Sequence, residues 1–339
     1  MTTAILVALI IVLVLLGPIF IRPIEQNVEL FFLAIGLLTA FFAKQLNREL
    51  LQAAVAEPLS FTIAVLVFGA AFRLSRKHLD QFFARLTLLI EPRTTCFGLT
   101  IALAALAPII TPVVAALVLV EAIALLRFAR STEIPITVLG CFAIGFGSGL
   151  TPLGMPGIAV VLRSLHANFW YLTGLLGPFV AVGVILAAAP ILVLPVTLNM
   201  GAELPRSKDS WKVVALVRPL KVYSFIAGLV ALSGGLRPAL DTYLHRVPEA
   251  FLFWLNTLSA VVNNSTLAAI EIGPTLNPAQ QRAALLGLLI SGGILVTGNL
   301  PNIVAAARLG IGSREWARVG LYIGIPLLLF CFLVVLWIG

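Results

Sequence analysis

The stretches Ser259–Pro274 (SAVVNNSTLAAIEIGP) and Ser291–Ala307 (SGGILVTGNLPNIVAAA) decide the fold. Each places a short polar group inside an apolar run of the kind that crosses a membrane. Lipid offers backbone N–H and C=O groups no hydrogen-bond partner, so such breaks persist only where they are buried in protein or line a cavity. Paired breaks of this kind are typical of the binding sites of secondary transporters.

The composition places the whole chain among membrane proteins. Of its 339 residues, 60% are hydrophobic and 11% are charged, and the mean hydropathy is +1.10. Soluble domains carry roughly 25% charged residues. The formal charge of +8 is spread over segments between apolar runs, which indicates cytoplasmic loops rather than nucleic-acid binding. The three cysteines lie in separate apolar segments and have neither disulfide nor metal-site spacing.

Apolar runs of roughly 20 residues predict the membrane spans. They indicate an all-α polytopic membrane protein of about eight full spans, two re-entrant hairpins and two interfacial helices. The first predicted elements are spans at residues 3–21, 28–43 and 59–72, a polar connector at 44–57, and an amphipathic interfacial helix at 73–93.

Two further breaks fall in the first half of the chain. Ala107–Pro112 (APIITP) splits an apolar run with two prolines and predicts a re-entrant hairpin with its tip near Thr111, a kinked long helix being the alternative. Ile144–Ser164 (IGFGSGLTPLGMPGIAVVLRS) predicts a discontinuous helix with an unwound middle. The second half repeats this order, with a hairpin tip near Asn264 and a helix break at Thr297–Asn302.

The two halves therefore indicate an internal duplication. Thr111–Pro112 aligns with Asn264–Ser265, and Thr151–Pro156 aligns with Thr297–Pro301. Each unit has an odd number of crossings, so the two units are predicted to be inverted. The predicted organisation is two leading helices at 1–57, a first repeat at 58–200, a cytoplasmic linker at 201–218 and a second repeat at 219–339.

The distribution of basic residues predicts the orientation. Of the 22 Lys and Arg residues, sixteen fall on one predicted side of the membrane and six on the other. The positive-inside rule makes the first side cytoplasmic. A multi-pass protein of the cell (inner) membrane is expected, with both termini outside.

The hairpin tips and helix breaks are predicted to meet in one site. Hydroxyl, amide and carbonyl oxygens there suit Na⁺, and helix N-termini beside them suit an anion. Asn264, Thr297 and Asn299 are the Na⁺ candidates, and no other cofactor is expected. The full set of predicted ion- or substrate-binding residues is Thr111, Ser148, Thr151, Asn263, Asn264, Ser265, Thr266, Thr297, Asn299 and Asn302.

Two acidic residues lie inside apolar runs, Glu121 and Glu271. An intramembrane carboxylate indicates a functional site, and proton coupling is the role considered for both. Glu271 lies close to the end of its hairpin arm, where a purely interfacial position is the alternative.

The break sequences resemble the Ion Transporter superfamily, which includes NhaD-type sodium/proton antiporters, arsenite permeases and divalent-anion/sodium symporters. GLTPLGMPGIAVV is similar to the T-P-x-G-x-P break of the antiporter branch, and NNST and TGNLPN resemble the Asn-rich motifs of the second repeat. GNLPNIVAAARLGIGSREWARVG looks most like a branch labelled predicted cation transporters. The resemblance implies separate scaffold and transport domains, a homodimer and elevator-type alternating access. Antiporter relatives carry acids in these motifs, whereas Met155 and Asn263–Asn264 are neutral.

The sequence thus predicts a secondary active, Na⁺- or H⁺-coupled transporter of a small inorganic ion. Na⁺-coupled symport of a small anion and a passive ion channel are the alternatives. An enzyme is not expected, because the three histidines fall in loops or interfacial helices and no H-E-x-x-H, G-x-S-x-G or nucleotide-binding loop occurs.

Overall fold

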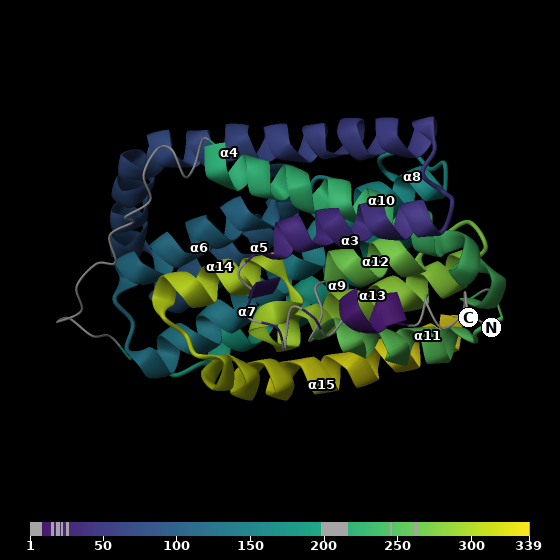
Figure 1. Cartoon of the computed structure of the whole chain (residues 1–339). Coiled ribbons are helices and arrows are strands. Elements are labelled where there is room, and N and C mark those ends of the chain that lie inside the picture. Colours follow the sequence, from purple (N-terminus) through teal and green to yellow (C-terminus); the bar gives the residue numbers. More distant parts are fainter. Residues whose placement is uncertain are drawn as a thin grey trace.

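The computed structural model describes residues 9–14, 17, 21, 23–24, 27–197, 216–244, 246–260 and 264–338. In these residues the regular secondary structure is helical, without a β-strand, and most of the long helices run side by side along one direction (Figure 1). Most of the predicted first span and of the predicted linker, and also Asn263, lie outside the described residues.

From residue 28 onwards, the first half of the chain contributes seven α-helices and one 3₁₀-helix to the described residues. They are α3 (Val28–Phe42), α4 (Arg48–Leu89), α5 (Pro92–Ile110), α6 (Pro112–Leu126), α7 (Arg130–Ser148), α8 (Pro156–Ser164), α9 (Tyr171–Ala188) and η1 (Ala189–Val193).

The second half continues from the segment that starts after residue 215. Its elements are α10 (Arg218–Leu244), α11 (Glu249–Leu255), η3 (Asn256–Ala260), α12 (Asn264–Glu271), α13 (Pro278–Ile294), η4 (Val296–Gly298), α14 (Leu300–Leu309) and α15 (Ser313–Ile338).

Five helical segments in the described residues are long and apolar enough to cross a membrane. The all-helical class is confirmed for the described residues and is consistent with a helical membrane protein, while the count of about eight spans stays a prediction. The remaining apolar helices, α3, α6 and α14, are shorter. The five candidate segments are Pro92–Ile110, Arg130–Ser148, Tyr171–Val193, Pro219–Thr242 and Ser313–Trp337.

Helix α4 is longer than the sequence pattern predicts. The residues predicted as a connector, a span and an interfacial helix form one continuous helix of 42 residues that contains Pro58. It begins directly after Asn47, whose side-chain oxygen accepts the backbone N–H of Leu50 at 2.7 Å and satisfies one of the free donors of the first turn. In Figure 1, α4 runs along the top of the bundle, and its last turns lie across one end.

Helices end at all four predicted breaks. α5 stops at Ile110 and α6 starts at Pro112; α7 stops at Ser148 and α8 starts at Pro156. Proline has no N–H to donate and is tolerated in the first helical turn, so it separates these elements locally. Thr111, the single residue between α5 and α6, has φ 73° and ψ 146°, a conformation that non-glycine residues adopt rarely.

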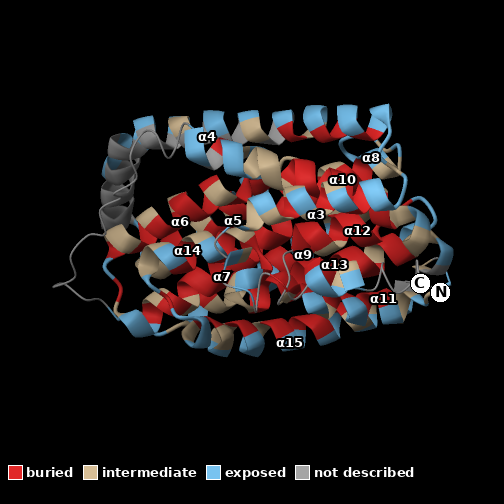
Figure 2. Ribbon diagram, in the orientation of Figure 1, coloured by how far each residue is buried: buried red, intermediate tan, exposed pale blue. Residues whose placement is uncertain are grey.

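The helices pack around two hydrophobic cores. The larger core is built mainly by α5, α6, α7, α9, α13 and α15. The smaller core is built mainly by α3, α4 and α10, with Val14, with Val160 of α8, and with Ala269 and Ile270 of α12. Figure 2 shows the buried residues concentrated in the middle of the bundle, around α7, α12 and α13. We call the contact of α8 and α12 with α4 and α10 the seam.

Within the smaller core, α3 and α10 pack backbone to backbone. A Cβ on Gly36 would lie 2.3 Å from the carbonyl oxygen of Gly228, so only glycine allows this crossing. Small residues at helix contacts are typical of membrane proteins, where close packing replaces the hydrophobic effect between helices.

Several packing pairs recur between the two halves. α7 packs against α9 as α13 packs against α15, and α4 packs against α6 as α10 packs against α12. Between the halves, α6 packs against α14 and α8 packs against α12.

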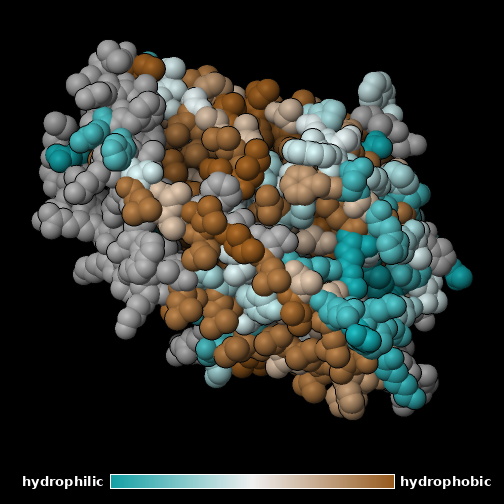
Figure 3. Space-filling model, turned by 90° about the horizontal axis from the view of Figure 1, so that it is seen from above, coloured by the Kyte–Doolittle hydropathy of each residue, from teal (hydrophilic) through white to brown (hydrophobic). Residues whose placement is uncertain are grey.

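The surface changes character along the bundle. Figure 3 shows hydrophobic side chains over the middle of one face and hydrophilic ones gathered towards one end. At one end of the seam, the α3–α4 connection meets the C-terminal parts of α8 and α10 and brings Gln45, Arg163, His166 and Arg237 around one cavity of about 250 Å³.

Candidate functional site

Asn264 is the polar residue at the centre of the second-half breaks. It is the first residue of α12, and only 1% of it is exposed. Neither Oδ1 nor Nδ2 of its amide has a hydrogen-bond partner among the described residues. The amide lies over Gly292 of α13, where an added Cβ would be 2.2 Å from Nδ2 and 2.3 Å from Oδ1. The close approach therefore depends on a glycine at position 292.

Asn302 holds the end of α13 in place. Its Nδ2 donates to the carbonyl oxygens of Gly292 at 2.8 Å and Leu295 at 2.9 Å, while Oδ1 has no partner among the described residues. The last carbonyls of a helix have no partner within the helix. The amide group of Asn302 therefore replaces the missing helical donors exactly where α13 stops, and it is a positioning residue for the break.

Asn299 caps α14 and faces the other half of the chain. Its Oδ1 accepts the backbone N–H of Leu300 at 2.9 Å, and its Nδ2 is buried without a partner among the described residues. A Cβ on Gly145 of α7 would lie 2.6 Å from that Nδ2. The Ser148 hydroxyl donates to the carbonyl oxygen of Gly145 at 2.8 Å. The end of α7 and the start of α14 thus meet at Gly145.

The remaining second-half residues join the same region to different degrees. The Thr297 hydroxyl is exposed and donates to the carbonyl oxygen of Ala260 at 3.3 Å, which links the helix break to the hairpin. The Thr266 hydroxyl is fully buried and has no partner among the described residues. The backbone of Ser265 packs against Gly157 in the first turn of α8, so this hairpin also touches the first-half break.

Two of the first-half residues, Thr111 and Thr151, lie near Pro108. The Thr151 hydroxyl donates to the carbonyl oxygen of Pro108 and accepts the backbone N–H of Gly154 at 3.3 Å. Thr111 is fully buried, and its hydroxyl has no partner among the described residues. Thr111 and Thr151 thus lie at Pro108, whereas Ser148 lies at Gly145, against which Asn299 packs. We call the second-half residues Asn264, Asn299 and Asn302 the amide cluster.

The two acidic candidates lie on different helices, Glu271 on α12 and Glu121 on α6. Glu271 is 7% exposed and accepts a hydrogen bond of 3.0 Å from Nδ2 of Asn256, which joins the two arms of the second hairpin. It ends α12, about 10 Å along the helix from Asn264 at 1.5 Å per residue. Glu121 is half-buried near the middle of α6.

Sequence reasoning missed two buried polar residues. Ser291 on α13 is fully buried, and its hydroxyl has no partner among the described residues. It directly precedes Gly292 and Gly293. A serine followed by two glycines near the end of an apolar run is the sequence pattern that could have indicated it. Asn256, whose Nδ2 donates to Glu271, is the second, and it is 1% exposed.

The chemistry of the amide cluster suits a hard cation or an anion. Amide and hydroxyl oxygens are hard ligands, and free amide N–H groups at the N-termini of α12 and α14 can donate to a negative charge. Within the described part of the chain, no three His, Cys, Asp or Glu side chains lie together in a way that could hold a metal ion.

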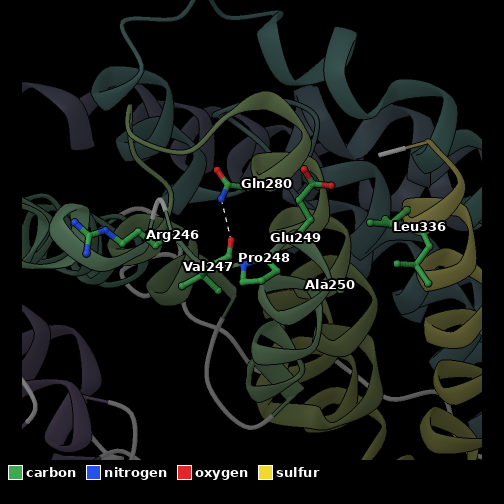
Figure 4. A pocket seen from close by; sticks show the side chains of 8 residues that line it. Arg246, Val247, Pro248, Glu249, Ala250, Gln280 and Leu336 are labelled. Atoms are coloured by element: carbon green, nitrogen blue, oxygen red, sulfur yellow. Dashed lines mark hydrogen bonds between the residues drawn. The ribbon is translucent and has the colours of Figure 1, made fainter.

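The surface pockets lie elsewhere. A cavity of about 430 Å³ is lined by the α10–α11 connection, the start of α13 and the end of α15. Figure 4 shows Gln280 there, with its Nε2 donating to the carbonyl oxygen of Val247 at 2.9 Å. Gln280 also completes a capping box with Asn277. Its amide therefore has a structural role at the start of α13, far along that helix from Gly292.

One family model matches residues 2–338, almost the entire chain, under the description "Protein of unknown function (DUF1646)". The chain belongs to this DUF1646 family. A search of curated proteins finds no match to it. The breaks at Thr151 and Asn299 both lie within the matched residues.

Proposed function

We propose that this DUF1646 protein is a secondary active transporter of a small inorganic ion, coupled to Na⁺ or H⁺, with its ion site at the second-half breaks. The amide of Asn264 carries the proposal, because it is buried between the start of α12 and Gly292 of α13 without a partner among the described residues. An unsatisfied buried polar group costs roughly 1–3 kcal/mol. A bound ion or solvent at the site would offset that cost.

The packing supports an inverted-repeat architecture of the Ion Transporter type. The order of elements after α4 and after α10 is similar. α6 of the first half packs against α14 of the second half, and α12, which corresponds to α6, packs against α8, which corresponds to α14. Under this proposal α5–α6 and α11–α12 are the re-entrant hairpins, and α7–α8 and α13–α14 are the discontinuous helices.

The two hydrophobic cores support elevator-type movement. A transport domain around the larger core would slide against a scaffold of α3, α4 and α10. Among the described residues, the bonds across the seam include the ion pair of Arg163 with Glu57 at 2.9 Å. The Arg237 and Ser233 side chains also donate across it to the carbonyl oxygen of Ala269 at 2.9 and 2.6 Å. A scaffold of this kind would form the homodimer, and the protein would reside in the inner membrane with both termini outside.

Na⁺-coupled symport of a small anion is the second candidate. It is favoured by the unpartnered Nδ2 atoms of Asn264 and Asn299, each at the N-terminus of a helix whose dipole attracts negative charge. Proton coupling would instead use Glu271 or Glu121.

The test is the unfolding stability of the purified protein during a titration of Na⁺ against choline. A ligand that binds only the folded state stabilises it by RT ln(1 + [L]/Kd). Na⁺ is expected to stabilise the wild type but not Asn264→Leu. Asn168→Ala, in the exposed connection between α8 and α9, is the matched control and should respond like the wild type.

Flux in proteoliposomes then separates the candidates. An Na⁺ gradient should drive movement of the transported ion, and an anion that stabilises the protein only with Na⁺ present would select the symporter. Wild-type stability that responds to neither Na⁺ nor pH would refute ion coupling.

A further inference from the structure

The interruptions of the two halves have similar sequences but use their polar groups differently. We call Thr111–Pro112 with Ser148–Pro156 the first break, and Asn264–Thr266 with Ser291–Asn302 the second break. In the first break, Pro112 has no N–H, so the carbonyl of Pro108 lacks the helical donor that a residue four positions later would supply. The Thr151 hydroxyl donates to this carbonyl. It also accepts the N–H of Gly154. The Thr151 hydroxyl therefore donates to one backbone group and accepts from another.

The other groups of the first break offer few ligands. The Ser148 hydroxyl is bound to the carbonyl oxygen of Gly145. The N-cap of α8 is Met155, which is 2% exposed and has a thioether in place of an oxygen. A hard cation requires several oxygen ligands. Among the described side chains of this break, only the Thr111 hydroxyl is unpartnered.

The second break has the opposite character. Its corresponding N-cap is Asn299, and the residue aligned with Thr111 is Asn264. The unpartnered buried atoms of this region are Oδ1 and Nδ2 of Asn264, Nδ2 of Asn299, Oδ1 of Asn302 and the hydroxyl oxygens of Thr266 and Ser291. Two amide oxygens and two hydroxyl oxygens are therefore available on α12, α13 and α14.

We infer that each chain binds a single cation, held at the second break, and that the first break is a structural joint closed by the Thr151–Pro108 hydrogen bond. The inference rests on the proposed function, since it assumes that the coupling or transported cation occupies these breaks. The two duplicated units would then differ in chemistry. The second unit would bind the cation, and the first would use Thr151 to attach the first hairpin to the segment that follows α7.

The experiment is equilibrium binding of radioactive Na⁺ to the purified full-length protein, with the number of ions per chain as the readout. We expect about one ion per chain for the wild type and none for Asn264→Leu. Thr151→Val should lower the unfolding temperature, because the Pro108 carbonyl is left unsatisfied, yet keep one ion per chain with Kd within about threefold of the wild type.

Thr111→Val gives a second arm that does not disturb a hydrogen bond of the described residues, and it should also keep the ion. Two ions per chain in the wild type, or loss of the ion in a folded Thr111→Val or Thr151→Val protein, would overturn the inference and leave the proposed function standing. Zero ions in the wild type, with Na⁺, Li⁺ and K⁺ each tested, would overturn the inference, and it would overturn the proposed function as well if wild-type stability also failed to respond to pH.

Discussion

Replacing Gly292 by Ala tests whether the Asn264 amide is an ion ligand without removing that amide. The added Cβ would lie 2.2 Å from Nδ2 and 2.3 Å from Oδ1, whereas ordinary van der Waals contact requires about 3.5 Å. The amide must therefore withdraw by about 1 Å. It is the far end of a side chain and can do so by rotation, so α12 and α13 keep their positions.

The expected loss of affinity follows from that displacement. A contact with a charged group contributes roughly 1.5–3 kcal/mol, which corresponds to an affinity about 10- to 150-fold lower. At a Na⁺ concentration about 100 times the wild-type Kd, binding stabilises the folded protein by about 2.7 kcal/mol. A variant with about 100-fold weaker binding gains only about 0.4 kcal/mol under the same condition.

The assay compares unfolding in Na⁺ and in choline for the wild type, Gly292→Ala and Gly98→Ala. Gly98 is the matched control, because a Cβ at this position on α5 meets no atom within 4 Å. Gly98→Ala should retain the full Na⁺ effect. If Gly292→Ala folds in choline and retains it too, the Asn264 amide does not contact the ion and the reasoning is wrong.

Three further predictions concern the framework around the site. Gly147→Ala should lower the free energy of unfolding by roughly 1–3 kcal/mol, because its Cβ would lie 1.9 Å from the backbone oxygen of Ala104; an unchanged thermal unfolding temperature would contradict this packing of α5 on α7. Arg163→Gln should lower the free energy of unfolding by less than about 1 kcal/mol, because its ion pair with Glu57 is partly exposed. A double-mutant cycle with Glu57→Gln should give a coupling energy of that size, and additive losses would show that the ion pair contributes nothing to stability. Arg130→Gln removes the hydrogen bonds of 2.8 Å to the carbonyls that end α14, so hydrogen–deuterium exchange should accelerate in residues 305–312, and exchange confined to other segments would argue against this anchor.

The positions of the helix breaks were predictable because their causes are local. Proline lacks an N–H wherever it stands, so α6 and α8 begin at Pro112 and Pro156 as the sequence indicates. The membrane class was predictable for a similar reason, since transfer of apolar side chains into lipid depends on composition. Helix α4 was predicted less well: its polar first turns were assigned to a connector, but a cap by Asn47 allows them to be helical.

The roles of the polar residues were decided only by the tertiary structure. Thr151 and Asn264 look like equivalent candidates in the sequence, each a polar residue in a helix break. Thr151 lies against a carbonyl 43 residues away that needs a donor, whereas the Asn264 amide lies over a glycine that offers it none. Whether a buried polar group is satisfied depends on atoms brought near it by packing of distant segments. The sequence alone determined the apolar composition of the helices and the places where helices stop; the packing of those helices decided which of the described buried polar groups lack a hydrogen-bond partner.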